Sequence, residues 1–160
     1  MKELTAKDIM NPDVIVVEAD LSVRDLATLF TEKMISGAPV VDKEGKLRGV
    51  VSQSDIVRND GHRTEIVQER SQNEYYLHGW EDKLNHEDMV ELHLEEADAL
   101  RVRDIMTPLV FKIPETVSLY EIVDTMIGGR IHRLIVTRGD EVVGIVTTLD
   151  LLKTMRDYLR

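Results

Sequence analysis

Apolar residues recur in both halves of the chain with the spacing of short strands and one-sided helices. Short runs that contain β-branched residues follow Pro12 and Pro108, and such runs are typical of strands because β-branched side chains suit a pleated sheet. After Ser22 and again after Ser118, apolar residues recur at i, i+3, i+4 and i+7. Each serine is therefore expected to cap the start of an amphipathic helix.

The predicted elements follow the same order in both halves. Strands are expected at Val14–Val17, Val40–Val41 and Leu47–Val51, and again at Val110–Ile113, Leu134–Val136 and Val142–Val146. Turns are expected at Glu44-Gly45 and Gly139-Asp140, and a second helix is expected to begin near Ser54 and near Leu149. Each half is thus predicted to be a β-α-β-β-α unit, which makes the fold class α/β of the α+β type.

The two halves also share sequence. AKDIMNP at Ala6–Pro12 matches VRDIMTP at Val102–Pro108, 96 positions later, and Leu21–Phe30 matches Val117–Met126 at the same spacing. After a slip of one residue, the stretch from Ala38 to Asp55 matches that from Arg133 to Asp150 at a spacing of 95. A period this long indicates duplication. Because units of this size rarely close a core alone, the two are expected to pack pseudosymmetrically and share a sheet interface.

The chain therefore divides into repeat 1 (residues 1–60), an insert (residues 61–100) and repeat 2 (residues 101–160). The insert is acidic and holds four of the five histidines and the only tryptophan, so it is expected to be a separate segment. Its HEDMVELHLEEADAL stretch predicts an acidic amphipathic helix. The histidines and glutamates there favour a solvated helix face over a metal site, and no metal is expected.

Aromatic and apolar side chains gather upstream of that predicted helix. They are Tyr75, Tyr76, Leu77 and Trp80. A cluster of this kind is expected to anchor the insert to the rest of the protein or to a partner.

Composition limits the classes of partner. The net charge of −10 disfavours nucleic acids and anionic membranes, so an anionic ligand would need a local cationic site. The absence of cysteine excludes disulfides, thiolate metal sites and cysteine nucleophiles. The charged N-terminus and the lack of a long apolar stretch predict a cytoplasmic protein with no membrane segment.

The DIMxP opening, the apolar middle strand and the paired phrases GVVSQSD (Gly49–Asp55) and GIVTTLD (Gly144–Asp150) resemble the cystathionine β-synthase (CBS) domain family. CBS repeats occur in tandem as a pair called a Bateman module. The resemblance covers repeats 1 and 2 and leaves out the insert. It implies a regulatory module with two pseudosymmetric clefts between the repeats. In many relatives such clefts bind AMP, ADP, ATP or S-adenosylmethionine.

The two paired phrases carry the first candidate ligand residues, Ser52 and Asp55 in repeat 1 and Thr147 and Asp150 in repeat 2. An aspartate at the start of a helix can accept hydrogen bonds from both ribose hydroxyls, and the hydroxyl with the free helix N–H groups can bind a phosphate. The glycine that opens each phrase keeps the strand free of a side chain at that point. The alternative is a capping box, which would stabilise the helix without any ligand.

A cationic cluster forms the second candidate site. Arg130, His132 and Arg133 are expected to enter the middle strand of repeat 2, and the resemblance implies that the His-Arg pair contacts phosphates. Repeat 1 has Gly37-Ala38 at the matching place, so the two clefts are not expected to be equivalent. The alternative is that these charges are solvated residues at a strand edge, which discourage aggregation.

An adenine would also need an apolar slot. The candidate residues are Met10, Val14, Ile15, Met106, Val110 and Phe111. Each of them is equally well explained as part of a core.

These patterns favour a stand-alone regulatory module over an enzyme, because the sequence contains no P-loop, HExxH motif or nucleophile elbow. The module is expected to bind an adenosine-containing ligand, to need no cofactor and to signal to an unidentified protein partner. The alternative is a ligand-free structural or oligomerisation module. Leu152, Met155 and Leu159 share a face of the predicted C-terminal helix, which is a candidate surface for a homodimer.

Overall fold

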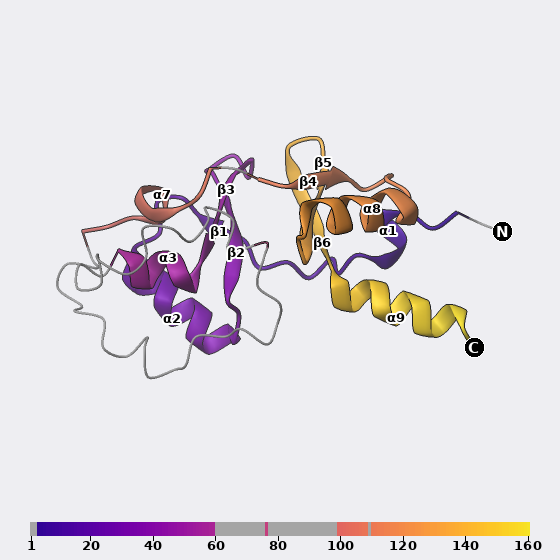
Figure 1. Cartoon of the computed structure of the whole chain (residues 1–160). Helices are drawn as coiled ribbons and strands as arrows, with labels where there is room; N and C mark the ends of the chain where they lie inside the picture. Colours follow the sequence, from indigo (N-terminus) through magenta and orange to yellow (C-terminus); the bar gives the residue numbers. More distant parts are fainter. Residues whose placement is uncertain (1–2, 60–75, 77–98, 109) are drawn as a thin grey trace. The chain divides into compact units, whose positions relative to one another are not determined.

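The structure is a computed structural model that describes residues 3–59, 76, 99–108 and 110–160 (Figure 1). The described residues contain two three-stranded sheets, each with helices, so the mixed α/β fold class is confirmed. They divide into two compact units, which do not coincide with the two sequence repeats. Unit 1 contains residues 3–14, Tyr76 and residues 111–160. Unit 2 contains residues 15–59, 99–108 and 110.

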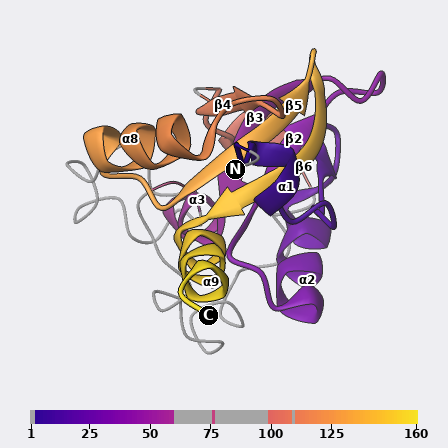
Figure 2. The same cartoon turned by 90° about the vertical axis from the view of Figure 1, so that its right-hand side faces the viewer.

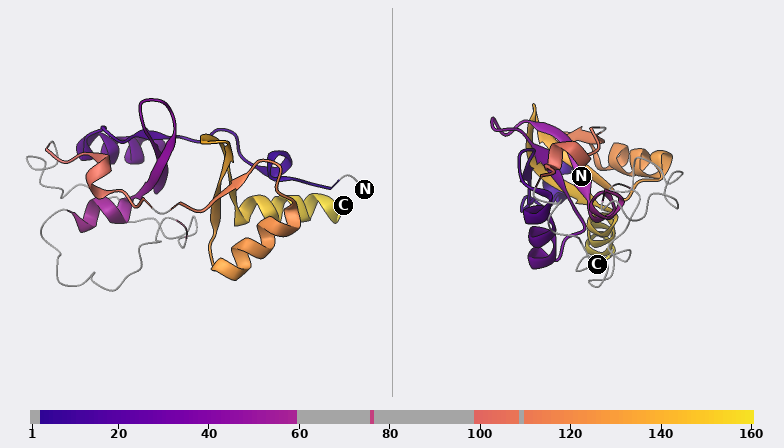
Figure 3. Two further views of the ribbon diagram at one scale, coloured as in Figure 1. Left: turned by 90° about the horizontal axis from the view of Figure 1, so that it is seen from above. Right: turned by 90° about the vertical axis from the view of Figure 1, so that its left-hand side faces the viewer.

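Unit 2 holds the sheet of repeat 1, in the order β1-β2-β3. Its elements are β1 (Val17–Glu18), α2 (Val23–Lys33), β2 (Gly37–Val41), β3 (Leu47–Ser52), α3 (Gln53–Arg58) and α7 (Val102–Ile105). Strand β2 runs parallel to β1 and antiparallel to β3. The helices lie on one side of this sheet (Figures 1 and 3).

Unit 1 holds the sheet of repeat 2, in the order β4-β5-β6, with the same strand directions. Its elements are α1 (Ala6–Ile9), β4 (Lys112–Pro114), α8 (Leu119–Gly129), β5 (Arg133–Arg138), β6 (Glu141–Thr147) and α9 (Thr148–Tyr158). Helices α1, α8 and α9 lie on one side of the sheet (Figures 1 and 2).

Each unit takes its short first helix from the other repeat. In unit 1, the backbone N–H of Ala6 in α1 donates to Val117 O at 2.8 Å, and Leu119 N donates to Leu4 O at 2.8 Å. After α1, Asn11 forms a bridge with Ile145 on β6. The opening segment of repeat 1 is therefore part of the unit built on repeat 2.

The exchange is reciprocal in unit 2. Here the backbone N–H of Val102 in α7 donates to Leu21 O at 2.9 Å, and Val23 N donates to Leu100 O at 3.0 Å. Val102 is fully buried in the core cluster of unit 2, which also contains Leu26, Phe30 and Val51. Each core is thus completed by apolar residues from the other repeat, and this exchange was not predicted from the sequence.

The strand register corrects one sequence match. Gly37 pairs with Ser52 in unit 2, and Arg133 pairs with Thr147 in unit 1. The slip of one residue therefore does not lie before Ala38. It lies in the hairpin. Residues 42–46 connect the paired residues Val41 and Leu47 in repeat 1, whereas the shorter stretch 138–141 connects the equivalent pair, Thr137 and Val142, in repeat 2. The repeat 1 counterparts of His132 and Arg133 are consequently Ser36 and Gly37, and the predicted Gly37-Ala38 was wrong by one position.

The other boundaries differ modestly from the prediction. Both long first helices and both hairpins are present, and Gly45 and Gly139 adopt positive φ in the turns. The first strand of each half is shorter and begins later than predicted, at Val17 and at Lys112. The predicted helix of the insert lies outside the described residues. Within the part of the chain that the structure describes, no helix is long and apolar enough to cross a membrane.

Two equivalent glycines allow the exchanged segments to approach the sheets. A Cβ added at Gly49 would lie 2.6 Å from the backbone oxygen of Thr107 and 3.0 Å from the sulfur of Met106. A Cβ added at Gly144 would overlap the sulfur of Met10 and lie 2.8 Å from its Cγ. The space beside each glycine is therefore occupied by the exchanged segment, with Met106 and the Thr107 carbonyl at Gly49 and Met10 at Gly144.

We predict that Gly49→Ala destabilises the protein by about 1–3 kcal/mol, because a backbone carbonyl stands in the way and overpacking is costly. Gly144→Ala should cost less, because the Met10 side chain is flexible and can move. Gly128→Ala is the matched control, since nothing lies within 4 Å of the added carbon on α8. It should stabilise the protein by up to about 1 kcal/mol through helix propensity. Urea unfolding measures all three, and equal effects of Gly49→Ala and Gly128→Ala would contradict the packing explanation.

Candidate functional site

The start of β5 and the end of β6 bring several predicted ligand residues together in unit 1. The antiparallel register sets Arg133 opposite Thr147, and Thr148 N donates to His132 O at 3.0 Å. The imidazole Nδ1 of His132 lies 3.4 Å from Thr148 Oγ1. We call His132, Arg133, Thr147, Thr148 and Asp150 the repeat 2 corner.

The aspartate of this corner caps α9. Asp150 Oδ2 accepts from the backbone N–H of Thr147 at 2.9 Å and from Thr147 Oγ1 at 2.7 Å. Its other oxygen accepts from Lys153 Nζ at 3.2 Å. The carboxylate is held at the N-terminus of an eleven-residue helix, where the helix dipole favours negative charge.

The equivalent residues of unit 2 form the repeat 1 corner, which consists of Ser36, Gly37, Ser52, Gln53 and Asp55. Asp55 Oδ2 accepts from the backbone N–H of Ser52 at 2.8 Å and from its hydroxyl at 3.0 Å. Asp55 Oδ1 accepts from Arg58 at 3.4 Å. Ser52 and Asp55 are both buried, each with 6% of its surface exposed, whereas Thr147 and Asp150 are half-buried.

The two corners therefore have the same cap and different chemistry beside it. Where repeat 2 places His132 and Arg133, repeat 1 places Ser36 and Gly37. The predicted difference between the two sites is thus found in the structure, although one residue away from the expected place.

Both aspartates form helix caps, the geometry that the capping-box alternative predicts. The same geometry occurs at helix starts outside both corners, where Asp8 Oδ2 accepts from the backbone N–H of Thr5 at 2.9 Å and from its hydroxyl at 2.8 Å. Glu121 accepts in the same way from Ser118. The motif by itself therefore marks a helix start, and any ligand role depends on what surrounds it.

Arg130 occupies a different place from the one predicted. It is the left-handed C-cap of α8, with a φ of 51°, and β5 begins three residues later at Arg133. Met34 has the same conformation at the end of α2. Arg130 is thus an exposed helix terminus and not a residue of the middle strand.

The predicted adenine slot is only partly assembled. Met10 packs on Gly144 and Met106 packs on Gly49, so the structure supports their explanation as packing residues. Val14, Ile15, Val110 and Phe111 are half-buried. Val14 and Phe111 belong to unit 1, and Ile15 and Val110 to unit 2. Clefts between the repeats stay a prediction.

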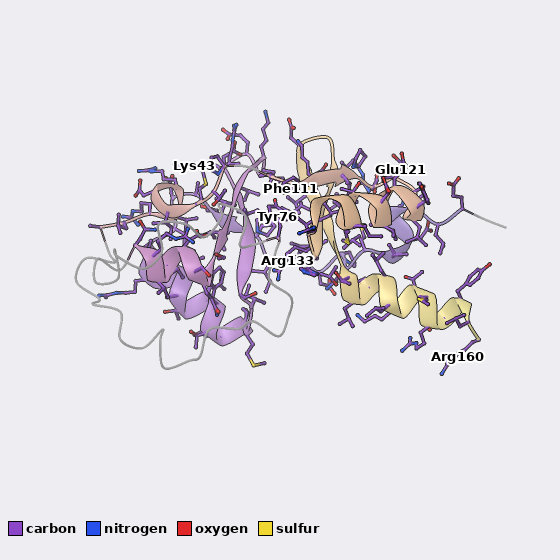
Figure 4. All side chains as sticks on the ribbon, viewed as in Figure 1. Lys43, Tyr76, Phe111, Glu121, Arg133 and Arg160 are labelled. Carbon is purple, nitrogen blue, oxygen red and sulfur yellow. The ribbon has the colours of Figure 1, made fainter. Side chains whose placement is uncertain are left out.

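One residue at the repeat 2 corner was not assigned to it by the sequence. Tyr76 has no exposed surface, and its backbone oxygen accepts from His132 N at 2.7 Å. Its hydroxyl accepts from Phe111 N at 2.8 Å, and the two rings meet edge to face with centroids 4.8 Å apart. Figure 4 shows Tyr76, Phe111 and Arg133 in this part of unit 1. The anchoring role predicted for the aromatic cluster is therefore confirmed for Tyr76.

A separate surface hollow of about 300 Å³ lies in unit 2. Its lining residues are Glu18, Ala19, Asp20, Asp42, Lys43, Glu44 and Arg103. Its charges largely pair with each other or with a neighbour: Asp20 pairs with Arg103 and Lys43, and Asp42 with Arg48. Backbone N–H groups of the hairpin, first of all that of Lys46, and Arg48 hold the pKa of Asp42 below its usual value. Among the described residues, no group of three or more histidine or carboxylate side chains is placed so that it could hold a metal ion.

Comparisons with known proteins identify the family. The sequence profile of the CBS domain matches the chain twice, over residues 6–61 and 102–157. The uncharacterized protein MJ1426 of Methanocaldococcus jannaschii is 32% identical over 157 residues, which cover 93% of this chain and 89% of that protein. The chain spans only 34% and 38% of two longer uncharacterized relatives, from Methanopyrus kandleri and M. jannaschii.

Solved structures show the same fold. The CBS-pair protein CBSX2 from Arabidopsis thaliana matches with a TM-score of 0.71 at 22% identity, over 99% of both chains. The structure of CBSX2 in complex with AMP matches with a TM-score of 0.67 at 24% identity, over 98% of both chains. The CBS domain pair of protein MJ0100 was solved with 5′-methylthioadenosine and S-adenosyl-L-methionine. It matches with a TM-score of 0.63 at 20% identity, over 98% of this chain and 99% of that one.

We predict that Asp150→Ala and Asp8→Ala each lower the free energy of unfolding by about 1 kcal/mol in the absence of ligand, because each removes the acceptor of one helix cap. Asp157→Ala is the control, since its carboxylate is exposed near the end of α9 and caps no helix start. Its effect should stay within about 0.5 kcal/mol. Urea unfolding measures the three values, and an Asp150→Ala protein as stable as the wild type would show that the cap contributes nothing.

Proposed function

The chain belongs to the CBS domain family, and we propose that it is a regulatory module that binds an adenosine-containing ligand at the repeat 2 corner. The observation that carries the proposal is the juxtaposition of His132 and Arg133 with Thr147, Thr148 and Asp150 in one unit. These side chains supply cationic, hydroxyl and carboxylate groups at the start of one helix.

Phosphate recognition follows from the cationic part of the corner. A chain with a net charge of −10 repels anions at long range, so binding depends on local positive charge. Arg133 can bind a phosphate with two parallel hydrogen bonds, and the N-terminus of α9 adds backbone N–H groups and a favourable dipole. The hydroxyl of Thr148, close to His132, completes a phosphate-binding set.

The ribose is assigned to the carboxylate. Asp150 is fixed by Thr147 at the helix start, and each of its oxygens has further acceptor capacity. A charge-assisted hydrogen bond from a ribose hydroxyl is worth roughly 1.5–3 kcal/mol. The AMP complex of CBSX2 and the S-adenosyl-L-methionine complex of MJ0100 support this ligand class.

The repeat 1 corner is expected to stay empty or to take a ligand with fewer phosphates. The His-Arg pair proposed to bind phosphate is replaced there by Ser36 and Gly37. Because of this difference in side chains, a phosphorylated ligand is expected to bind more tightly at the repeat 2 corner than at the repeat 1 corner.

The proposed role is regulatory and not enzymatic. Ligand binding would shift the protein between two conformations that differ in affinity for a protein partner. The energy available for that signal equals the difference between the ligand's affinities for the two conformations. No cofactor is needed for such a role.

A homodimer is the second part of the proposal, and the C-terminal helix favours it. Leu149, Leu152, Met155, Tyr158 and Leu159 on or just after α9 are all exposed, and the exposed fractions of the last four lie between 57% and 74%. An apolar helix face of this kind marks an interaction surface. If the corner binds no ligand, this face supports the alternative function of an oligomerisation module.

We predict that one of AMP, ADP, ATP and S-adenosylmethionine raises the melting temperature, since a ligand at about 100 times its Kd adds about 2.7 kcal/mol of stability. Asp150→Ala and Arg133→Ala should abolish the shift.

Two variants serve as matched controls in the same scanning calorimetry. Asp8→Ala loses the same kind of cap outside the corner, and Arg156→Ala removes an exposed arginine that pairs with Asp157. Both should keep the ligand shift of the wild type. If none of the four compounds shifts the wild-type melting temperature, the ligand-binding function is wrong and the oligomerisation module remains.

We predict that Leu152→Glu converts a dimer into a monomer, because a charge on the apolar face of α9 would be buried without a partner. Ile127→Glu on α8 is the control, since Ile127 is equally apolar and 71% exposed but lies on another helix. Light scattering coupled to size-exclusion chromatography gives the mass of each variant. A wild-type mass equal to that of one chain would contradict the homodimer.

A further inference from the structure

Tyr76 binds the two backbone donors that border the repeat 2 corner. One donor is the N–H of His132, directly before β5, and it is bound by the backbone oxygen of Tyr76 at 2.7 Å. The other is the N–H of Phe111, directly before β4, and it is bound by the tyrosine hydroxyl at 2.8 Å. A single residue of the insert therefore bridges the beginnings of two neighbouring strands.

The chemistry of this contact is that expected for a bound base. An adenine presents a flat aromatic ring, whose nitrogens accept hydrogen bonds from backbone N–H groups. Tyr76 presents an aromatic ring packed edge to face on Phe111, together with an oxygen that accepts from the Phe111 N–H. The ring is completely covered, as a base bound in an apolar slot would be.

The placement also fits the rest of the corner. Phe111 O accepts from Ile135 N at 3.2 Å, which ties the segment before β4 to the strand that begins at Arg133. On the other side, His132 O accepts from the backbone of Thr148 at the start of α9. Tyr76 is thus linked through one set of backbone hydrogen bonds to the proposed phosphate-binding and ribose-binding residues.

We propose that Tyr76 occupies the position of the ligand's base in the repeat 2 corner and is an internal competitor that sets the affinity of this site. This inference rests on the proposed function. The protein with Tyr76 in place cannot bind the base there, so the apparent affinity is reduced by the fraction of molecules in which Tyr76 is displaced. Ligand binding and the anchoring of the insert through Tyr76 are then mutually exclusive, which gives the module a way to convert ligand concentration into a change at the insert.

The experiment measures AMP binding to the full chain by isothermal titration calorimetry. Tyr76→Ala should bind AMP about tenfold or more tightly than the wild type, because minor conformations are commonly populated at 10% or less. Tyr120→Ala is the matched control. Tyr120 lies on α8 in the same unit and is 77% exposed, so its removal should leave AMP affinity unchanged.

Tyr76→Phe provides a second variant that keeps the ring and loses only the hydroxyl. It should bind AMP more tightly than the wild type by a smaller factor. Amide hydrogen exchange checks the contact without any ligand: the Phe111 N–H should exchange faster in Tyr76→Phe, whereas the His132 N–H, bound to the backbone oxygen, should not. This variant carries the test if Tyr76→Ala fails to fold, and an AMP affinity equal to or below that of the wild type would then overturn the inference.

The outcomes separate the inference from the proposed function. If the wild type binds AMP and Tyr76→Ala binds it more weakly, Tyr76 is a wall of the site, so the inference is wrong and the function stands. If the wild type binds AMP and Tyr76→Ala binds it more tightly, both are supported. If only the Tyr76 variants bind AMP, the inference stands and the ligand-binding function of the wild-type chain is wrong. If neither the wild type nor any Tyr76 variant binds AMP or the other three adenosine compounds, the proposed function falls, and Tyr76 is a structural anchor only.

Discussion

The reciprocal exchange of the two opening segments is the constraint on which the rest of the structure depends. A three-stranded sheet with two helices leaves apolar surface uncovered, and each unit covers it with a four-residue helix from the other repeat. The segments are held by backbone hydrogen bonds and by a methionine on a glycine, and the Arg103–Asp20 ion pair adds a side-chain contact in unit 2. Because neither repeat completes its own core, neither is expected to be stable when separated from the other. The fold of each unit therefore requires both copies of the repeat.

Local sequence signals predicted most of the helices and strands, but they could not predict the exchange of segments between the two units. Amphipathic spacing over eleven residues identifies α2 and α8, and the two glycine turns identify the hairpins, since these signals are local. A helix of four residues, such as Ala6–Ile9, is too short to show a period. Its partner sheet lies more than a hundred residues away along the chain, and a single sequence carries no signal for such a pairing. The one-residue slip between the two repeats was predicted at the wrong place, because Val41 and Thr137 fit a strand equally well in either alignment. Only the pairing of the strands shows that the slip lies in the hairpin.

The candidate site was predictable to the extent that its residues follow local rules. Ser52, Asp55, Thr147 and Asp150 were found because helix starts have a sequence signature, and they do cap helices. The same signature could not say whether they also bind a ligand. Thr5 with Asp8 has the same geometry at a helix start that belongs to neither corner. Tyr76 shows the opposite case, since its aromatic character was evident but its contacts with Phe111 and His132 arise only from tertiary structure.

The duplicated scaffold also explains how one corner can specialise without loss of stability. In both units the cap, the glycine and the exchanged methionine stabilise the fold, and none of these contacts involves the side chain just before β2 or β5 or that of the first residue of either strand. The backbone N–H of Gln53 and that of Thr148 make the same hydrogen bond, to Ser36 O and His132 O respectively, whatever side chains those residues carry. Side chains at these positions are thus free to differ between repeats. The proposed binding role of His132 and Arg133 can therefore differ from the role of Ser36 and Gly37 without a change in the backbone hydrogen bonds of either corner.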